Sequence, residues 1–238
     1  MNKTTIIILA AGKGTRMQSE LPKVLHTIND KPMIKHVLNV AKNLNPENII
    51  IVVGYKKEMI IESLKDNDVI FVEQRNQNGT ADAIKECIPT LENFQGDVLI
   101  LSGDVPLIKK KTLESFINLH NSKKSLASLI SSELIDPTGY GRIIKNNNNQ
   151  LIKIIEHKDA TNKQKEINEI NSGIYIFNSK ILNEKINLIN NDNKQKEYYL
   201  TDIFNYIDES NTSIYKIKNH YEISGINNIE QLENLNNF

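Results

Sequence analysis

The sequence predicts an α/β fold: a mainly parallel, mixed sheet flanked by helices, with a small α+β lobe. Two observations indicate this class. Apolar runs rich in β-branched residues, such as Ile6-Ile7-Ile8, are bounded by polar segments, as in strands buried on both faces. Between these runs lie segments whose apolar residues recur with the helical period, which is typical of βαβ units. At 238 residues the chain is long enough for one such domain with a minor lobe.

The first half alternates between strands and helices. Strands are predicted at Thr4–Ala10, Asn48–Val53, Val69–Val72 and Asp97–Ser102, and helices at Pro32–Asn43, Asp82–Glu92 and Thr112–Asn121. Each helix is predicted from an apolar stripe, and Pro32 suits an early helical position. These stripes indicate core packing rather than a cofactor site.

The second half is richer in strands. They are predicted at Leu126–Ser131, Arg142–Lys145, Leu151–Glu156, Asn171–Phe177 and Ser213–Lys218, with helices at Ser179–Ile189, Tyr199–Ile207 and Asn228–Leu235. The polar run Asn146–Asn149 is interpreted as a hairpin connection. This half is therefore expected to form the small α+β lobe and to complete the sheet. The glycines show no six-residue spacing, so no left-handed β-helix is expected within these residues.

Composition excludes several classes of function. The 29 Lys and Arg residues balance 29 Asp and Glu residues, so no long-range field would recruit nucleic acid or an anionic membrane. The apolar run near the start is too short for a signal peptide, and no segment approaches the ~18 apolar residues of a spanning helix. We therefore expect a soluble, cytoplasmic protein. Cys87 falls within a helical stripe and is expected to be a small buried hydrophobe.

The segment from Leu9 to Met17 is the most informative part of the chain. It follows the first predicted strand, and ligands of open α/β sheets bind beyond the carboxyl ends of the strands. Small residues at Ala10, Ala11 and Gly12 allow close approach of a ring, and backbone N–H groups of such a loop can turn toward phosphate. The loop lacks both the Gly-Lys-Ser/Thr of a Walker loop and the third glycine of a dinucleotide fingerprint. Taken alone, it is equally compatible with a structural turn.

Two cations strengthen the phosphate interpretation. Arg16 lies within the loop and Lys23 follows shortly after it. An arginine fork and a lysine point charge on one loop suit a triphosphate with about four negative charges. Without the glycine-rich loop, both would be interpreted as surface charges.

Two further strand ends carry polar groups. Asp104 follows the apolar strand that ends at Ser102, where a carboxylate can hold a hard divalent cation or can simply cap a turn. Gln74 follows another strand and offers both a donor and an acceptor, as reading a pyrimidine edge requires. Gly79 and Thr80 come next at a helix start, where Thr80 could serve only as an N-cap.

Together these segments resemble the pyrophosphorylase domain of bacterial bifunctional N-acetylglucosamine-1-phosphate uridyltransferases. The resemblance spans almost the whole chain and implies a Rossmann-like nucleotide-diphospho-sugar transferase fold over residues 1–227, followed by a C-terminal helix at 228–238. It rests on Leu9–Met17, Leu21–His26, Gln74 with Gly79-Thr80, Gly103–Ile108, Asp136–Arg142, Glu156–Thr161, Glu169–Gly173, Glu197–Asp202 and Gly225–Asn228. The loop after the first strand specifies only the superfamily, whereas Asp136–Arg142 and Glu156–Thr161 are far narrower.

The resemblance implies a role for individual residues. Uridine would be held by Leu9, Ala10, Ala11, Gly12 and Gln74, with Gly79 and Thr80 beside it; Arg16 and Lys23 would meet the phosphates. Asp104 and Asn227 would be the Mg²⁺ ligands, since this ion prefers a few protein oxygens together with water and phosphate. Gly141, Glu156 and Asn171 would face the acetamido sugar, with Ser102 and Gly103 nearby. Some family members carry an aromatic residue where Ser102 stands, so one contact to the sugar nucleotide is expected to differ.

The expected reaction is attack of a sugar 1-phosphate on the α-phosphorus of UTP, giving UDP-N-acetylglucosamine for cell-envelope synthesis and pyrophosphate. Larger members of the family continue into a β-helical acetyltransferase domain, so acetyl transfer and the trimer that domain supports are not expected of these residues; a chain ending at Phe238 would be a monomer or weak dimer. Three alternatives stay open. They are the same chemistry on another sugar 1-phosphate, a non-catalytic nucleotide-sugar-binding module, and a dinucleotide-dependent dehydrogenase.

Overall fold

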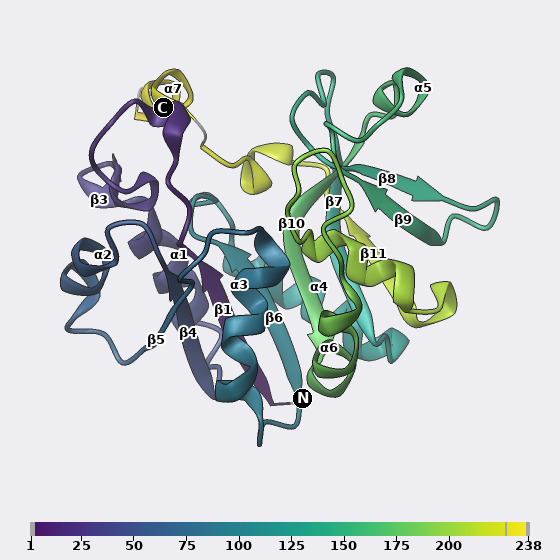
Figure 1. Ribbon diagram of the computed structural model, residues 1–238, viewed down its shortest axis with the longest axis horizontal. Coiled ribbons are helices and arrows are strands. Elements are labelled where there is room, and N and C mark those ends of the chain that lie inside the picture. Colours follow the sequence, from purple (N-terminus) through teal and green to yellow (C-terminus); the bar gives the residue numbers. More distant parts are fainter. Residues whose placement is uncertain (1–2, 227, 237–238) are drawn as a thin grey trace.

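The computed structural model describes residues 3–226 and 228–236. Its strands are β1 (Thr4–Leu9), β2 (Thr27–Ile28), β3 (Lys31–Pro32), β4 (Asn48–Val53), β5 (Ile70–Glu73), β6 (Asp97–Ser102), β7 (Ala127–Glu133), β8 (Arg142–Lys145), β9 (Leu151–Ile155), β10 (Glu169–Asn178) and β11 (Thr212–Lys216). In this part of the chain, β2 and β3 form a separate pair and the other nine form one sheet. The order is β11-β7-β10-β6-β1-β4-β5, with the β8–β9 hairpin attached to β10 (Figure 1).

The main sheet is mixed but mainly parallel, as predicted. β1 pairs in parallel with β4 and β6, β4 with β5, and β7 with β11, whereas β10 is antiparallel to β6 and β7. Parallel pairing brings the carboxyl ends of β1, β4, β5 and β6 to one edge. Leu9 is opposite both Val52 and Ser102, and Val53 is opposite Glu73.

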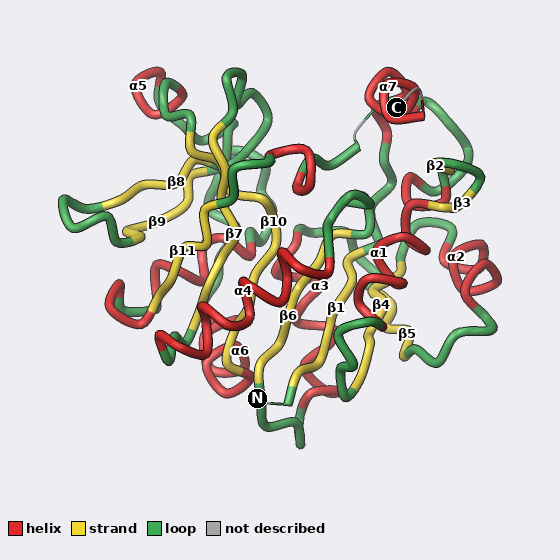
Figure 2. Tube along the Cα trace, turned by 180° about the vertical axis from the view of Figure 1, so that it is seen from behind, coloured by secondary structure: helices red, strands yellow, loops and turns green. Residues whose placement is uncertain are grey.

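Helices cover both faces of the sheet. The α-helices are α1 (Met33–Lys42), α2 (Lys57–Leu64), α3 (Thr80–Cys87), α4 (Lys110–Lys123), α5 (Asn162–Lys165), α6 (Ser179–Lys185) and α7 (Ile229–Asn236). Shorter 3-10 segments occur at Thr15–Met17, Lys23–Leu25, Ile88–Leu91, Ile186–Leu188, Leu200–Tyr206, Glu209–Asn211 and His220–Ile223. α3 and α6 lie in front of the sheet in Figure 1, and α1 and α4 lie in front of it in the reverse view of Figure 2.

The apolar strands are explained by burial on both faces. Ile6 and Ile8 pack in one core cluster with residues of α1 and α4, while Ile7 packs in a second cluster with residues of α3 and α6. Alternate residues of a strand point to opposite faces, so a strand with helices on both sides needs apolar residues at every position. All three isoleucines are fully buried, and each such burial contributes roughly 1.5–3 kcal/mol.

Some predicted boundaries and elements differ from the structure. The helix predicted at Asp82–Glu92 begins earlier, at Thr80, and changes to a 3-10 segment at Ile88; Pro89 lacks the N–H that would continue the α-helix. The helix predicted at Tyr199–Ile207 is a 3-10 segment. α2 was not predicted, because only Ile60 and Leu64 of its residues are buried and its apolar stripe is correspondingly weak.

Cys87 lies on the buried side of α3 and is fully buried. Burial raises the pKa of its thiol to about 12. Since the thiolate is the reactive form, the folded protein is expected not to react with a disulfide reagent at pH 8. Titration should detect no thiol in the native state and the chain's one cysteine in denaturant. Rapid modification without denaturant would contradict the buried position.

No helix in residues 3–226 and 228–236 combines the length and the apolar character needed to cross a bilayer. α7 packs beside the first part of the chain, where Leu232 contacts a small cluster formed by Ile28, Met33 and Ile226. The end of the described chain therefore returns to the half of the molecule that contains β1.

Candidate active site

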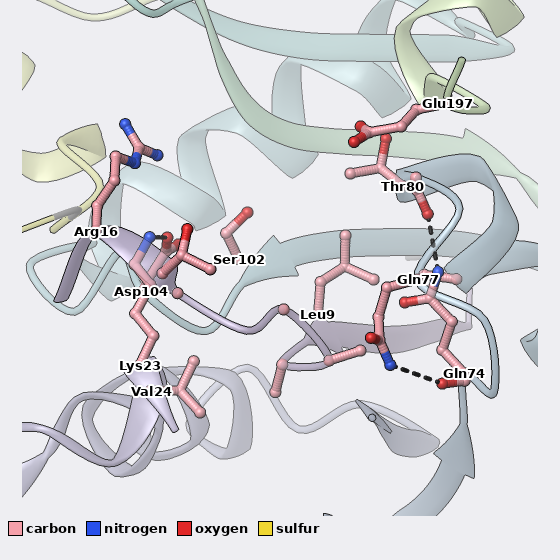
Figure 3. Close-up of a pocket in the computed structure, with 17 residues that line it drawn as sticks. Leu9, Arg16, Lys23, Val24, Gln74, Gln77, Thr80, Ser102, Asp104 and Glu197 are labelled. Carbon is pink, nitrogen blue, oxygen red and sulfur yellow. Dashed lines mark hydrogen bonds and ion pairs between the residues drawn. The ribbon is translucent and has the colours of Figure 1, made fainter. Parts of the chain in front are cut away.

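A pocket of about 390 Å³ opens at the edge where β1 and β6 end, and we call it the strand-end pocket (Figure 3). Its lining includes most of the residues predicted from the sequence: Leu9, Ala10, Ala11, Gly12, Arg16, Lys23, Gln74, Gly79, Thr80, Ser102 and Asp104. Gly14, Thr15, Val24, Gln77, Ala83 and Glu197 also line it. Residues from five stretches of the chain thus converge on one cavity, and three of these stretches follow the parallel strands β1, β5 and β6, as expected for ligand-binding loops.

Backbone pairing holds the first loop in place. Ala10 N–H donates to the Val52 carbonyl at 2.9 Å, and Gly103 N–H donates to the Leu9 carbonyl at 2.9 Å. Gly14 adopts a left-handed conformation with φ of 61°, and a Cβ there would lie 2.5 Å from the Cβ of Lys23. Glycine at this position therefore allows the two predicted phosphate-binding segments to pack directly against each other.

Charged groups gather on one side of the strand-end pocket. Figure 3 shows Arg16, Lys23 and Asp104 together there, with an ion pair between Lys23 Nζ and Asp104 Oδ2. The two paired side chains are only 14% and 23% exposed. Partial burial strengthens their attraction relative to a surface pair and fixes both head groups.

Asp104 is also tied to the segment that leads to α7. Ile226 N–H donates to the Asp104 carbonyl at 3.0 Å, so the chain passes beside this strand end. Asn227, the second predicted metal ligand, is the next residue and lies outside the described residues. Within the described part of the chain, no group of three or more His, Cys, Asp or Glu side chains is arranged to hold a metal ion. Asp104 itself supplies a carboxylate oxygen, the type of ligand that suits a hard cation such as Mg²⁺.

Amide and hydroxyl groups lie on the other side of the pocket. Gln74 is 4% exposed, and its Nε2 donates to the Gly79 carbonyl at 3.0 Å and to Asp82 Oδ2 at 2.8 Å. These bonds fix which end of the amide faces the loop. Thr80 is the first residue of α3 rather than its N-cap, which is Gly79, and its hydroxyl accepts the Leu200 N–H at 2.9 Å.

Glu197 lines the pocket but had no role predicted from the sequence. In Figure 3 it lies beside Thr80. Two backbone bonds bring it there: Tyr198 N–H donates to the Asn78 carbonyl at 2.7 Å, and Ala81 N–H donates to the Tyr198 carbonyl at 2.9 Å. Nothing in the local pattern around Glu197 predicts this pairing, although Glu197 opens one of the motifs that carry the resemblance.

Gly141, Glu156 and Asn171 do not line the strand-end pocket but lie side by side where the β8–β9 hairpin meets β10; we call them the lobe cluster. Arg142 is opposite Ile155 in the β8–β9 hairpin and opposite Ile170 in β10. Gly141 precedes Arg142, Glu156 follows Ile155 and Asn171 follows Ile170. Because the strands are antiparallel, the three residues lie together on the same side of these paired positions, which we call one rung of the sheet. Accordingly, Asn171 N–H donates to the Gly141 carbonyl at 2.9 Å, and a Cβ on Gly141 would lie 3.5 Å from the Glu156 carboxylate.

Glu156 is half-buried and lies among other acids. Burial raises its pKa most strongly, and the negative charges of Asp202, Asp159 and Glu197 raise it further. The hydroxyl of Thr201 donates to Glu156 Oε1 at 3.0 Å and partly offsets this rise. The carboxylate is therefore held in one orientation by Thr201 while its charge remains poorly compensated.

Asn171 is oriented by its neighbours. Its Nδ2 donates to the Tyr175 hydroxyl at 2.6 Å, and its Oδ1 accepts the Gly173 N–H at 3.3 Å. The pairing of β10 with β7 shifts register between Asn171 and Tyr175, so this side chain sits at a strand irregularity. Such irregularities commonly re-aim side chains next to active sites.

The lobe cluster adjoins the strand-end pocket. A Cβ on Gly173 would lie 3.5 Å from the Ser102 hydroxyl, which connects β10 to the pocket wall. Burial raises the pKa of Tyr140, which precedes Gly141, and the nearby charges of Asp104 and Arg16 also act on this pKa, the first raising it and the second lowering it. A molecule that fills the pocket could therefore extend toward the cluster.

The chain is similar to curated proteins over almost its whole length. The bifunctional protein GlmU of Rippkaea orientalis is 42% identical over 228 residues, which cover 95% of this chain and 50% of that protein. The GlmU of Alkaliphilus metalliredigens is 44% identical over 232 residues, covering 97% of this chain and 50% of that protein. The chain thus spans about half the length of these curated relatives.

Solved structures confirm the predicted fold. A UDP-glucose pyrophosphorylase complexed with UDP-glucose superposes with a TM-score of 0.77 at 18% identity, covering 99% of this chain and 97% of that one. A putative glucose-1-phosphate thymidylyltransferase from Bacillus anthracis gives 0.73 at 20% identity, covering 98% and 94%. A family model described as nucleotidyl transferase matches residues 5–222. The chain belongs to the nucleotidyl transferase family.

Proposed function

We propose that the protein condenses N-acetyl-α-D-glucosamine 1-phosphate with UTP to give UDP-N-acetylglucosamine and pyrophosphate, a precursor-forming step for the cell envelope. The observation that carries this proposal is the meeting of two sites. A pocket with Arg16, Lys23 and Asp104 on one side adjoins a separate cluster of sugar-compatible groups, Gly141, Glu156 and Asn171. The motifs that resemble N-acetylglucosamine-1-phosphate uridyltransferases supply both sets.

The strand-end pocket is proposed to hold UTP. The small residues Ala10, Ala11 and Gly12 leave room for the base, and the buried amide of Gln74 supports its recognition. Gly79 and Thr80 lie beside it at the start of α3, where backbone N–H groups favour negative charge. The triphosphate would extend toward Arg16 and Lys23.

Mg²⁺ is proposed to bind at Asp104 together with Asn227. The carboxylate chemistry of Asp104 suits a hard cation. The backbone hydrogen bond between Ile226 and Asp104 places Ile226, the residue before Asn227 in the sequence, beside Asp104. The ion would neutralise charge on phosphate oxygens. Lys23, which pairs with Asp104 in this structure, would be available to a phosphate when that carboxylate binds a cation.

The chemistry is an in-line displacement at phosphorus. An oxygen of the sugar 1-phosphate forms a bond to the α-phosphorus of UTP while the bond to the bridging oxygen of the β-phosphate breaks, and pyrophosphate leaves. Because both reactants are anions, the protein's task is to align them and to offset their repulsion. Arg16 and Lys23 supply fixed positive charge on the side of the pocket where phosphate would lie.

The lobe cluster is proposed to select the acetamido sugar, with Ser102 and Gly103 at the junction. Glu156 and Asn171 are both oriented by protein hydrogen bonds, from Thr201 and to Tyr175 respectively. A site with pre-oriented polar groups rejects a sugar that leaves one of them unpaired.

We further propose a cytoplasmic protein whose partners are these small molecules, with residues 1–227 as the catalytic unit and 228–238 as an appended helix.

An assay of pyrophosphate release with Mg²⁺ and UTP tests the proposal. Turnover is expected with N-acetylglucosamine 1-phosphate and is expected to fall by at least about tenfold for glucose, galactosamine and unacetylated glucosamine 1-phosphates. Faster turnover with another sugar would shift the substrate assignment. Binding of UDP-N-acetylglucosamine without any pyrophosphate release would favour a non-catalytic binding module instead.

Glu156→Gln is expected to separate stability from function. A carboxyl whose pKa is raised by folding destabilises the folded state by an amount that is absent below its unfolded pKa, grows as the pH rises above that value and is complete above its folded pKa. At pH 7 the glutamine variant should therefore be at least as stable as the wild type, and this advantage should vanish below pH 4.5, the ordinary value of the group. Its KM for the sugar 1-phosphate should rise about 10- to 100-fold.

Thermal melts across pH and initial-rate kinetics check both parts of this prediction. Glu166→Gln, an exposed change at the C-cap of α5, is the matched control and should alter neither quantity. An unchanged KM in Glu156→Gln would remove Glu156 from the proposed sugar site.

A further inference from the structure

We propose that Arg142 is a positioning residue that holds the three members of the lobe cluster in register for the sugar. This inference rests on the proposed function, because it concerns the same sugar site. Arg142 itself need not touch substrate. Its side chain contacts the turn before Gly141 and the segment after Glu156, and its backbone pairs with β10 beside Asn171.

Arg142 is an unusual residue to find where it lies. Its side chain is only 1% exposed and is among the largest fully buried side chains of the described chain. Burial lowers its pKa, and the charge of Asp136 only partly opposes this. Taking a guanidinium out of water costs free energy, and an apolar side chain of similar volume often stabilises a core as well or better. Stability alone is therefore a poor reason for arginine at this position.

The hydrogen bonds of Arg142 join three segments. Its Nη1 donates to the Tyr140 carbonyl, which immediately precedes Gly141. Its Nη2 donates to the Lys165 carbonyl at the end of α5 and to His157 Nδ1, each at 3.4 Å. His157 follows Glu156 directly. The guanidinium thus ties the turn at Gly141 to the segment after Glu156 and to α5.

The sheet register gives these contacts their consequence. Arg142 is paired with Ile155 and Ile170, and Gly141, Glu156 and Asn171 are the residues just beyond that rung. The Gly141 carbonyl accepts the Asn171 N–H at 2.9 Å. A shift of the Tyr140–Gly141 turn would therefore move the Gly141 backbone relative to the side chains of Glu156 and Asn171.

Arginine is suited to this task in a way that lysine is not. Its planar fork directs donors at several acceptors at once, whereas an ammonium group on a flexible stem does not hold such a geometry. Arg142 Nε is buried and has no hydrogen-bond partner among the residues that the structure describes, which is unfavourable for stability. The two terminal nitrogens, Nη1 and Nη2, make the hydrogen bonds to the three segments. This pattern agrees with a positioning role for Arg142 rather than a packing role.

The test compares Arg142→Lys and Arg142→Met with the wild type. Lysine keeps the charge and methionine keeps apolar volume, and neither supplies the fork. KM for the sugar 1-phosphate is expected to rise between about 10-fold and 100-fold in both, because small misplacements of a binding site have effects of this size. KM for UTP should stay within about twofold. Ile143→Val, a buried change in the same strand, is the matched control and should leave both KM values unchanged.

A second measurement keeps the inference testable if one variant is unstable. The positive charge of Arg142 lowers the pKa of His157, after the larger effect of burial. In Arg142→Met the NMR titration of His157 should therefore move to higher pH, while in Arg142→Lys the pKa should stay closer to that of the wild type. A His157 titration that is unaffected by either change would contradict the contact.

The kinetic outcomes separate this inference from the proposed function. KM is measured with whichever sugar 1-phosphate the wild type prefers, so a different preferred sugar would revise the function and leave the role of Arg142 testable. If the wild type turns over and both variants keep the wild-type KM for sugar, the positioning role is wrong. It is equally wrong if KM rises by the same factor for sugar and for UTP, since that result indicates general destabilisation.

Discussion

Replacing Asp104 by asparagine is expected to lower kcat/KM for pyrophosphate release by at least about 100-fold while leaving the fold intact. Asp104 is the carboxylate that faces Arg16 and Lys23 in the strand-end pocket, and it is the proposed Mg²⁺ ligand. Asparagine has nearly the same shape but lacks the negative charge that attracts the cation. The Asp104 side chain is partly exposed, so the loss of its ion pair with Lys23 should cost little stability.

The measurement is turnover as a function of Mg²⁺ concentration, with a thermal melt as a check of folding. The variant should need more Mg²⁺ for its residual activity if the aspartate holds the ion. Asp97→Asn, at the opposite end of the same strand, is the control and should keep wild-type turnover below its melting temperature. Wild-type turnover and Mg²⁺ dependence in Asp104→Asn would mean that the cation is held elsewhere.

Gly79→Ala is expected to damage nucleotide binding and stability together. Gly79 has φ of 119°, and a Cβ there would lie 2.4 Å from the Tyr198 carbonyl oxygen and 2.7 Å from its nitrogen. These are backbone atoms, so relief requires the segment carrying Tyr198 to move away. That movement would break the 2.9 Å hydrogen bond from Ala81 N–H to the Tyr198 carbonyl. It would also shift the Gly79 carbonyl, which accepts a hydrogen bond from Gln74 Nε2.

We expect the melting temperature of Gly79→Ala to fall by at least about 5 °C, since backbone strain of 1–3 kcal/mol adds to the clash. KM for UTP should rise at least about tenfold. Gly139→Ala separates strain from clash, because Gly139 also has a positive φ of 87° but no atom of the described residues lies within 4 Å of its added Cβ. The control should lose roughly 1 kcal/mol and keep its KM for UTP. Equal effects of the two changes on UTP would contradict the proposed role of the Gly79 turn.

Strands and the positions of loops were predictable because their signals are local. Ile6, Ile7 and Ile8 are all buried, so an unbroken apolar run predicts a central strand and places the following loop at the ligand-binding edge. α2 was missed because a short helix that buries only two residues leaves a weak pattern. The 3-10 geometry of Leu200–Tyr206 was missed because α and 3-10 segments share nearly the same periodicity.

By itself, the sequence determined which segments form the main sheet, where the glycine-rich loop falls and which polar residues follow strand ends, because periodicity and chain order suffice for those conclusions; the two-residue strands β2 and β3 were missed. Only the tertiary structure decided that Lys23 pairs with Asp104, that Glu197 reaches the pocket, and that Gly141, Glu156 and Asn171 meet beyond one rung. Each of these is a contact between residues far apart in the chain. Such contacts depend on strand register and on long-range backbone pairing, which no local pattern of residues encodes.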